Sequence, residues 1–287
     1  MIGLRLPAAA RPASAVLQTV GGSRYLLHGG PDLINGYLRK GQVWEARTLR
    51  LAQVLLAGVA EPVVVDVGAN LGAFAVPMGR WVGARGGRLV AFEPQRMVYY
   101  QLCANLFLNG LVHCEAHHLA VGDQPGWVDV PLLNVATEGN LGGLSLDEGI
   151  RRSQRGITSA VQRSERVRLV TLDTEQLPNA HLIKIDVEGM ELEVLTGARA
   201  WLTRSGFPPV LFEVWGEKMV AYRDKRERLL HWVRHTLGYE VTLLGELCVA
   251  QHPSNKRFDI TLNPDRSVSM NAVSSNGKSA TVASVSS

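Results

Sequence analysis

The hydrophobic pattern of the chain alternates between helical spacing and short β-branched runs. Trp44, Leu51 and Val54 recur at helical spacing, which predicts a helix over 44–56. Residues 63–67 form a short run typical of a strand that is buried on both faces. Later strands are expected at 89–92, 112–121, 182–186 and 209–215, and helices at 70–81, 96–108, 188–202 and 219–237. This alternation indicates a parallel sheet with helices on both faces.

Both ends of the chain depart from this alternation. Residues 1–43 are expected to form an irregular lead-in segment with Gly-Gly turns, and residues 264–287 a polar, disordered tail. Residues 127–132 are a candidate edge strand, and 240–244, 247–251 and 259–262 are candidate antiparallel strands. The sequence therefore predicts a single α/β domain over 44–263.

The composition indicates the general class of protein but does not identify a binding partner. With 46% hydrophobic and 20% charged residues, the chain has the balance of an ordinary globular protein. Its net charge of +4 is weak for a dedicated nucleic-acid binder. The three cysteines form no Cys-x-x-Cys pair, which speaks against a disulfide scaffold or zinc site and favours a cytoplasmic location. No apolar run reaches the roughly 20 residues of a membrane span, so no membrane association is expected.

Candidate chemistry begins at the turn after the first buried strand, because ligands of such sheets bind beyond the carboxyl ends of the strands. Gly68 and Gly72 let the backbone approach a ligand closely. Asp66 suits the amino group of a methionine moiety, or it simply caps the helix in a tight turn. The Gly-x-x-x-Gly spacing differs from the Gly-x-Gly-x-x-Gly of dinucleotide-binding proteins, which disfavours a nicotinamide cofactor.

The next two strands are followed by further acids. Glu93 lies about 20 residues past the glycine turn, where a carboxylate can accept the hydroxyls of a ribose. Its alternative is a role in capping the next helix. Asp123 could receive the amino group of adenine, although it is also an ordinary turn residue. In chain order, these features predict a nucleoside site.

Acids also end the fourth and fifth strands. Asp186 and Glu213 are candidates for orienting or deprotonating an acceptor hydroxyl. Lys184 precedes Asp186 on the same strand face, so it is expected to pair with Asp186 or to lie buried beneath it. Glu188 is equally compatible with a helix-start acid and a catalytic acid. No metal site is predicted.

The residues at these positions resemble the FkbM-type methyltransferases, a family of class I enzymes that use S-adenosylmethionine. The resemblance rests on VVDVGANLG (64–72), AFEP (91–94), NLFLNGL (105–111), LAVGD (119–123), LIKIDVEGMELEVLTGA (182–198) and, more loosely, LFEVW (211–215). It implies a Rossmann-like, mostly parallel seven-stranded sheet with a C-terminal antiparallel hairpin.

The same resemblance implies a set of cofactor contacts. These are Asp66, Gly68, Asn70, Gly72, Glu93, Asp123 and Asp186, with Glu45 as part of an aromatic-acid pair that closes over the cofactor. It also implies that the loop 140–145 lies near the acceptor.

Family resemblance implies O-methylation of a small-molecule, polyketide or glycan hydroxyl. Two alternatives stay open, an RNA ribose 2′-O-methyltransferase and a non-catalytic cofactor-binding partner in a biosynthetic complex. The arginine-rich insert at 151–168 bears on this choice, because Arg151, Arg152 and Arg155 could recognise a phosphate or carboxylate of the acceptor. A solvated loop is the simpler interpretation of these arginines.

Overall fold

A seven-stranded sheet forms the centre of the molecule in the computed structural model, which describes residues 15–132, 139, 141–147, 149–150, 163–215, 222–273 and 281–285. Its strands, in chain order, are β3 (Val63–Val67), β4 (Arg88–Phe92), β5 (Cys114–His117), β9 (Leu182–Ile185), β10 (Val210–Glu213), β11 (Glu240–Leu244) and β12 (Leu247–Gln251). Their spatial order is β11-β12-β10-β9-β3-β4-β5. β12 is antiparallel to both of its neighbours, and the other pairings are parallel. This is the predicted mostly parallel sheet with an antiparallel hairpin, here β11–β12.

The strand order creates a crevice at one place in this sheet. From β3 the chain proceeds outward to β4 and β5, and it then returns to place β9 on the other side of β3. Loops that follow β3 and β9 therefore diverge at the carboxyl edge, which is where ligands of doubly wound sheets bind.

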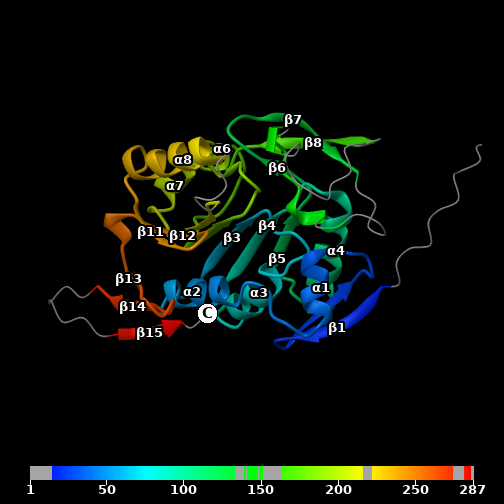
Figure 1. The fold of residues 1–287 in the computed structure, drawn as a ribbon, viewed down its shortest axis with the longest axis horizontal. Coiled ribbons are helices and arrows are strands. Elements are labelled where there is room, and N and C mark those ends of the chain that lie inside the picture. The colour runs from blue at the N-terminus through cyan, green and yellow to red at the C-terminus, as the bar shows by residue number, and fades with distance from the viewer. Residues whose placement is uncertain are drawn as a thin grey trace, which may run out of the picture.

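Helices cover both faces of the sheet (Figure 1). One face packs against α2 (Ala46–Leu55), α3 (Ala75–Gly83) and α4 (Arg96–Leu108), and the other against α6 (Glu191–Thr196), α7 (Arg199–Arg204) and α8 (Arg223–His235). A hydrophobic core lies on each face of the sheet, and alternate residues of a strand point into opposite cores. Val64 packs in the core on the first face, and Val65 in the core on the second. Burial on both faces explains why the strands are runs of apolar residues.

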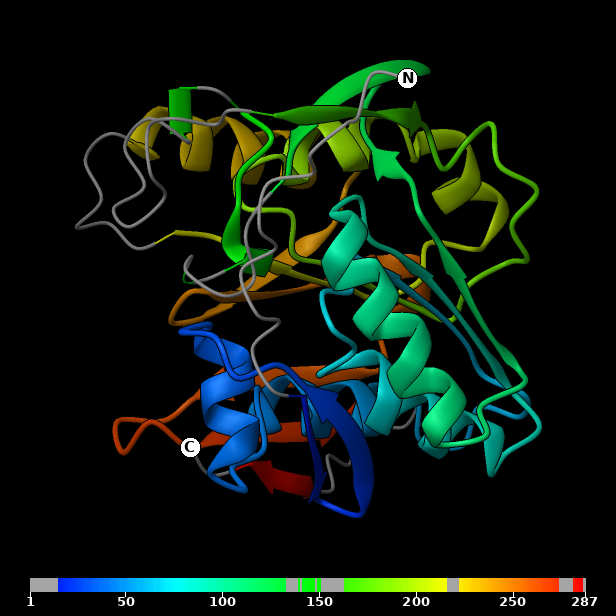
Figure 2. The same cartoon turned by 90° about the vertical axis from the view of Figure 1, so that its right-hand side faces the viewer.

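The segments expected to be irregular contain regular structure. Residues 15–39 form the hairpin β1 (Val16–Val20) and β2 (Ser23–Leu27) and the helix α1 (Leu33–Arg39). Figure 2 shows the hairpin beside α4, where the Asn105 side chain accepts a hydrogen bond from Leu26 N at 2.7 Å. Because this hairpin depends on contacts with a distant helix, its Gly-Gly turns alone suggested only a loop.

The expected disordered tail also needs correction. Residues 268–272 and 281–285 form β14 (Val268–Ala272) and β15 (Thr281–Val285). β14 pairs with both β13 (Phe258–Leu262) and β15 in a separate antiparallel sheet. β13 therefore does not extend the β11–β12 hairpin. Val268 and Met270 are fully buried and join the core around α2. The burial of these two side chains helps to anchor this polar segment to the domain.

A small third sheet interrupts the predicted third strand. β5 ends at His117, and β6 (Ala120–Val121) pairs with β8 (Ser164–Val170) beside β7 (Gly126–Pro131). The end of the arginine-rich insert is thus the strand β8, and an ion pair between Arg96 and Glu165 ties it to α4. Arg151, Arg152 and Arg155 lie outside the described residues.

Two expected helices differ from the structure at their ends. α3 begins at Ala75 instead of residue 70, because 70–74 continue the turn after β3. The expected helix over 188–202 is split into α6 and α7 at Gly197. Asp173 accepts hydrogen bonds from the backbone N–H groups of Ala200 and Trp201, which gives α7 its own start. Among the described residues, no helix combines the length and apolar character of a membrane span.

Candidate active site

Two adjoining cavities lie at the crevice between β3 and β9. The inner cavity, of about 590 Å³, is lined mainly by apolar side chains together with Glu93 and Gln95. The outer cavity, of about 1020 Å³, is lined by Trp44, Trp215 and several carboxylates. Gly68, Gly142, Asp186 and Glu188 line both cavities. A ligand that passes Gly68 would therefore extend from one cavity into the other.

The turn after β3 allows close approach because Gly68 has no side chain. Its φ is +78°, and a Cβ built there would lie 1.9 Å from the Asp186 carbonyl oxygen. The N–H groups of Gly68 and Ala69 both donate to the Phe92 carbonyl, at 3.0 and 2.9 Å. The loops after β3, β4 and β9 are thereby held together around one narrow passage.

Replacement of Gly68 by Ala should destabilise the fold by about 3 kcal/mol, because the loops must separate to admit a methyl group. Gly110 is the matched control, since its φ is +63° but a Cβ there meets nothing within 4 Å. G110A should cost about 1 kcal/mol from backbone strain alone. Urea unfolding of both variants measures the difference, and equal losses would contradict the role of the Gly68 contact.

Glu93 occupies the wall of the inner cavity and is only 4% exposed. Its Oε2 accepts a hydrogen bond from Asn70 N at 2.9 Å, and its Oε1 accepts one from Gln95 N at 2.8 Å. Glu93 therefore stabilises the turn before α4, which is the alternative role that the sequence offered for it. It also lines the inner cavity. Burial raises the pKa of Glu93 to about 7, so hydroxyl donors from a ligand would favour its ionised form.

A buried lysine links two of the strand-end acids. Lys184 Nζ lies 3.2 Å from Asp186 Oδ2 and 3.6 Å from Asp66 Oδ1. Asp66 and Lys184 face each other on adjacent parallel strands, and Asp66 is completely buried. The predicted pairing of Lys184 with Asp186 is confirmed. Asp66, in contrast, serves as a buried counterion and does not reach either cavity.

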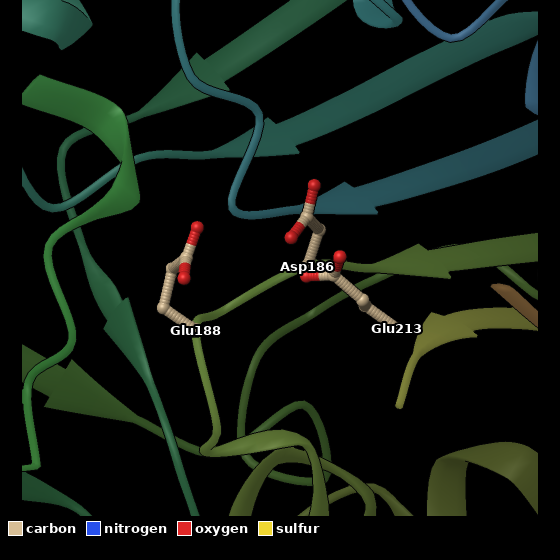
Figure 3. Close-up of side chains that lie close together, drawn as sticks. All are labelled: Asp186, Glu188 and Glu213. Carbon is tan, nitrogen blue, oxygen red and sulfur yellow. The ribbon is translucent and has the colours of Figure 1, made fainter. Parts of the chain in front are cut away.

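Three carboxylates converge on the outer cavity. Asp186 and Glu188 follow β9, and Glu213 ends β10 (Figure 3). One oxygen from each lies within 4.8 Å of the others. Burial, followed by repulsion from Asp186, raises the pKa of Glu213 to about 9 and that of Glu188 to about 8. A sulfonium, a metal cation or added protons would each offset this repulsion, so the donor set has cation-binding chemistry that the sequence did not single out.

The backbone around this cluster is strained. Glu45, Asn70 and Glu188 have φ values of 49°, 53° and 55°, a region that non-glycine residues adopt infrequently. All three line the outer cavity.

Glu191, and not Glu188, is the acid at the start of α6. Its Oε1 accepts hydrogen bonds from the backbone N–H groups of Val187 and Gly189. Glu188 is left free to face the cavity.

Stability should depend on pH through Glu213. A carboxyl with a pKa of about 9 in the folded protein, against 4.5 ordinarily, binds a proton that the unfolded chain releases. The free energy of unfolding should therefore fall as pH rises from about 4.5 to 9. Glu213→Gln cannot titrate, so this variant should lose less stability between pH 6 and 9 than the wild type does. Urea unfolding at several pH values tests this, with the exposed Glu227→Gln as control; parallel curves for E213Q and wild type would refute it.

The structure brings most of the predicted site residues together. Those that line a cavity are Glu45, Gly68, Asn70, Glu93, Asp186 and Glu213. Gly72 packs against α4 instead, since a Cβ there would lie 3.0 Å from Leu102 Cδ1. Asp123 is exposed in the turn after β6 and is not among the residues that line the inner cavity, although Val121, two residues earlier, is. Its role in receiving the adenine amino group stays a prediction.

Sequence reasoning missed other residues of the site. Gln95 and Glu246 were not considered, although Gln95 lines the inner cavity and Glu246 the outer one. Glu246 belongs to the β11–β12 turn, which no local motif connects with the crevice. In the loop 140–145, Gly142 and Gly143 line the outer cavity, and Asn140 lies outside the described residues.

Comparison with known proteins places these observations in a family. The model of the FkbM methyltransferase domain matches residues 66–241. No curated protein matches the chain.

Similar folds occur among solved structures. An FkbM methyltransferase from Methylobacillus flagellatus is 18% identical, with a TM-score of 0.43 over 67% of this chain and 44% of its own. The chain thus spans less than half the length of that protein. Rv0187 from MTB is 15% identical, with a TM-score of 0.45 over 72% of this chain and 80% of its own. An O-methyltransferase from Thermotoga maritima is 13% identical, with a TM-score of 0.43 over 93% of this chain and 75% of its own.

The family match covers more than half of the chain, including the end of β3 and all of β4, β9 and β10, the strands whose ends build the two cavities. The chain belongs to the FkbM family of S-adenosylmethionine-dependent methyltransferases.

Proposed function

We propose that the chain methylates a hydroxyl group of a small-molecule, polyketide or glycan acceptor that is not a polyanion. The observation that carries this proposal is the acidic outer cavity. Its described lining includes the carboxylates Glu45, Asp186, Glu188, Glu213 and Glu246, and contains no lysine or arginine. A carboxylate can accept a hydroxyl proton, and a lining without lysine or arginine offers no cation that would hold a phosphate group.

The residues of the inner cavity fit the nucleoside part of S-adenosylmethionine. Glu93 offers carboxylate oxygens for ribose hydroxyls, and Leu119, Val121 and Leu144 offer apolar surface for a base. At the passage, Gly68 and Asn70 would lie beside the methionine moiety. When bound, the cofactor supplies an electrophilic methyl group attached to a positively charged sulfur.

Asp186 is the best candidate for receiving the acceptor proton. It lines both cavities, so its carboxylate lies where the two ligands would meet. The Lys184 ammonium lies 3.2 Å from Asp186 Oδ2 and holds the carboxylate in place. Glu213, with a pKa of about 9, carries a proton at neutral pH and would orient the acceptor through a hydrogen bond.

The aromatic side chains suit a carbon-rich acceptor. Trp44 and Trp215 both line the outer cavity, and Tyr37 and Tyr222 pack edge-on against them with ring centroids 5.1 and 4.3 Å apart. Held by these contacts, the two indoles provide preorganised flat surfaces for an alkyl chain or sugar ring. Nothing in the described cavity favours the RNA alternative.

Methyl transfer to fractionated cell extract tests the proposal. Purified protein is incubated with cofactor that carries a tritiated methyl group, and the label is followed through separation by charge and size. We expect label in a neutral or basic small-molecule or glycan fraction, bound as a base-stable ether. Label in RNA would overturn the proposal. Tight binding of S-adenosylhomocysteine without transfer to any fraction would instead support the non-catalytic alternative.

A further inference from the structure

The inner cavity contains a buried polar atom that the described part of the chain leaves without a hydrogen-bond partner. This atom is Oε1 of Gln95, a residue that is only 4% exposed and lines the cavity. Buried acceptors are almost always paired in folded proteins, because an unpaired one has lost its hydration without compensation. A donor supplied by a ligand would resolve this deficit.

The orientation of the Gln95 amide follows from its other contact. Its nitrogen, Nε2, lies 2.8 Å from the carbonyl oxygen of Pro131 at the end of β7. A carbonyl can only accept, so the amide nitrogen must face Pro131 and the oxygen must face away from it. Gln95, which lines the inner cavity, therefore holds its amide oxygen on the side away from Pro131.

Gln95 is also tied to the residue expected to bind the ribose. Its backbone N–H donates to Glu93 Oε1 at 2.8 Å, and it is the N-cap residue of α4. The two side chains thus belong to one rigid turn, with Pro94 between them. A ligand held by Glu93 would find the Gln95 oxygen at a set position.

The surroundings define which donor the oxygen can receive. Leu119, Val121 and Val130 line the same cavity and offer no hydrogen bonds from their side chains. We infer that Gln95 Oε1 accepts a hydrogen bond from the exocyclic amino group of the cofactor's adenine, the role that the sequence suggested for Asp123. A 6-oxo purine presents an acceptor at that position, so it would leave the Gln95 oxygen unpaired against another oxygen.

Calorimetric titration with two nucleosides tests this inference. The probes are S-adenosylhomocysteine and S-inosylhomocysteine, which differ at the 6-position of the purine. The adenine compound has an amino group there, and the inosine compound has an oxo group together with a proton on N1. Wild-type protein should prefer the adenine compound by at least about tenfold, the effect of one buried hydrogen bond made or lost. In Gln95→Leu the preference should fall to within about threefold.

Asp123→Ala is the matched control, because it removes the competing candidate from an exposed turn. This variant should keep the wild-type preference. Gln95→Met, which has a similar length and no amide, provides a second test if Gln95→Leu does not fold. Loss of the hydrogen bond to Pro131 should weaken the binding of both probes alike, so the ratio of the two affinities isolates the effect of the amide oxygen. Equal binding of both probes by wild type, an unchanged preference in both Gln95 variants, or loss of preference in Asp123→Ala would each overturn the inference.

Discussion

Asp186→Asn should lower the rate of methyl transfer by about 10²–10⁴-fold, the range that a positioned general base contributes. The amide retains the shape of the side chain but cannot take up the acceptor proton. Because Asp186 reaches the cavities from the loop after β9, whereas Glu93, the residue proposed to hold the ribose, lies in the loop after β4, cofactor affinity should change much less. The rate is measured as initial transfer of tritiated methyl groups, and affinity by titration with S-adenosylhomocysteine.

Glu188→Gln provides the matched control for this prediction. It removes a second carboxylate from the same cluster, but one with a pKa of about 8, which is largely protonated at neutral pH. Its effect on the rate at pH 7 should be smaller than that of D186N. If D186N retains full activity, or if both variants lose the same activity, then Asp186 is not the base.

Lys184→Met should destabilise the protein by about 3–5 kcal/mol, the usual consequence of removing one partner of a buried ion pair. Asp66 is fully buried, and neither of its carboxylate oxygens has a hydrogen-bond partner among the described residues. Without Lys184, its charge would have no compensation. The free energy of unfolding in urea at pH 8 measures the loss.

Two further variants separate charge compensation from packing. Lys184→Met combined with Asp66→Asn should recover a large part of the lost stability, because the uncompensated charge is gone. Lys256→Met removes an ion pair with two exposed acids, Glu240 and Asp259, and should cost less than about 1 kcal/mol. A double variant no more stable than Lys184→Met alone would show that the lysine acts by packing rather than by charge.

The local sequence pattern was sufficient to predict the helices and strands whose formation does not depend on distant segments. The expected strand over 63–67 and helix over 96–108 coincide with β3 and α4. A β-branched run indicated the strand, and the Asn-Gly pair at 109–110 indicated where the helix ends; both are local signals that do not depend on distant residues. The same reasoning placed Glu93, Asp186 and Glu213 beyond strand ends, and parallel strands bring such ends to one edge of the sheet.

Contacts between distant segments decided what the pattern could not. The hairpin β1–β2 depends on α4, and β6 leaves the main sheet because β8, which is more than 40 residues away, supplies its partner. Asp123 is exposed in the turn after β6, whereas Gln95, at the start of α4, lines the inner cavity.

The sequence by itself determined the alternating α/β architecture, the family and the acids at the strand ends, because periodicity and short motifs are local properties of the chain. The tertiary structure alone decided which of those acids line a cavity. Asp66 lies within β3 and is buried beside Lys184, whereas Asp186 directly follows β9 and is partly exposed to the cavities. That difference arises from strand register and from the loops that close above each strand, and both are set by residues far apart in the chain.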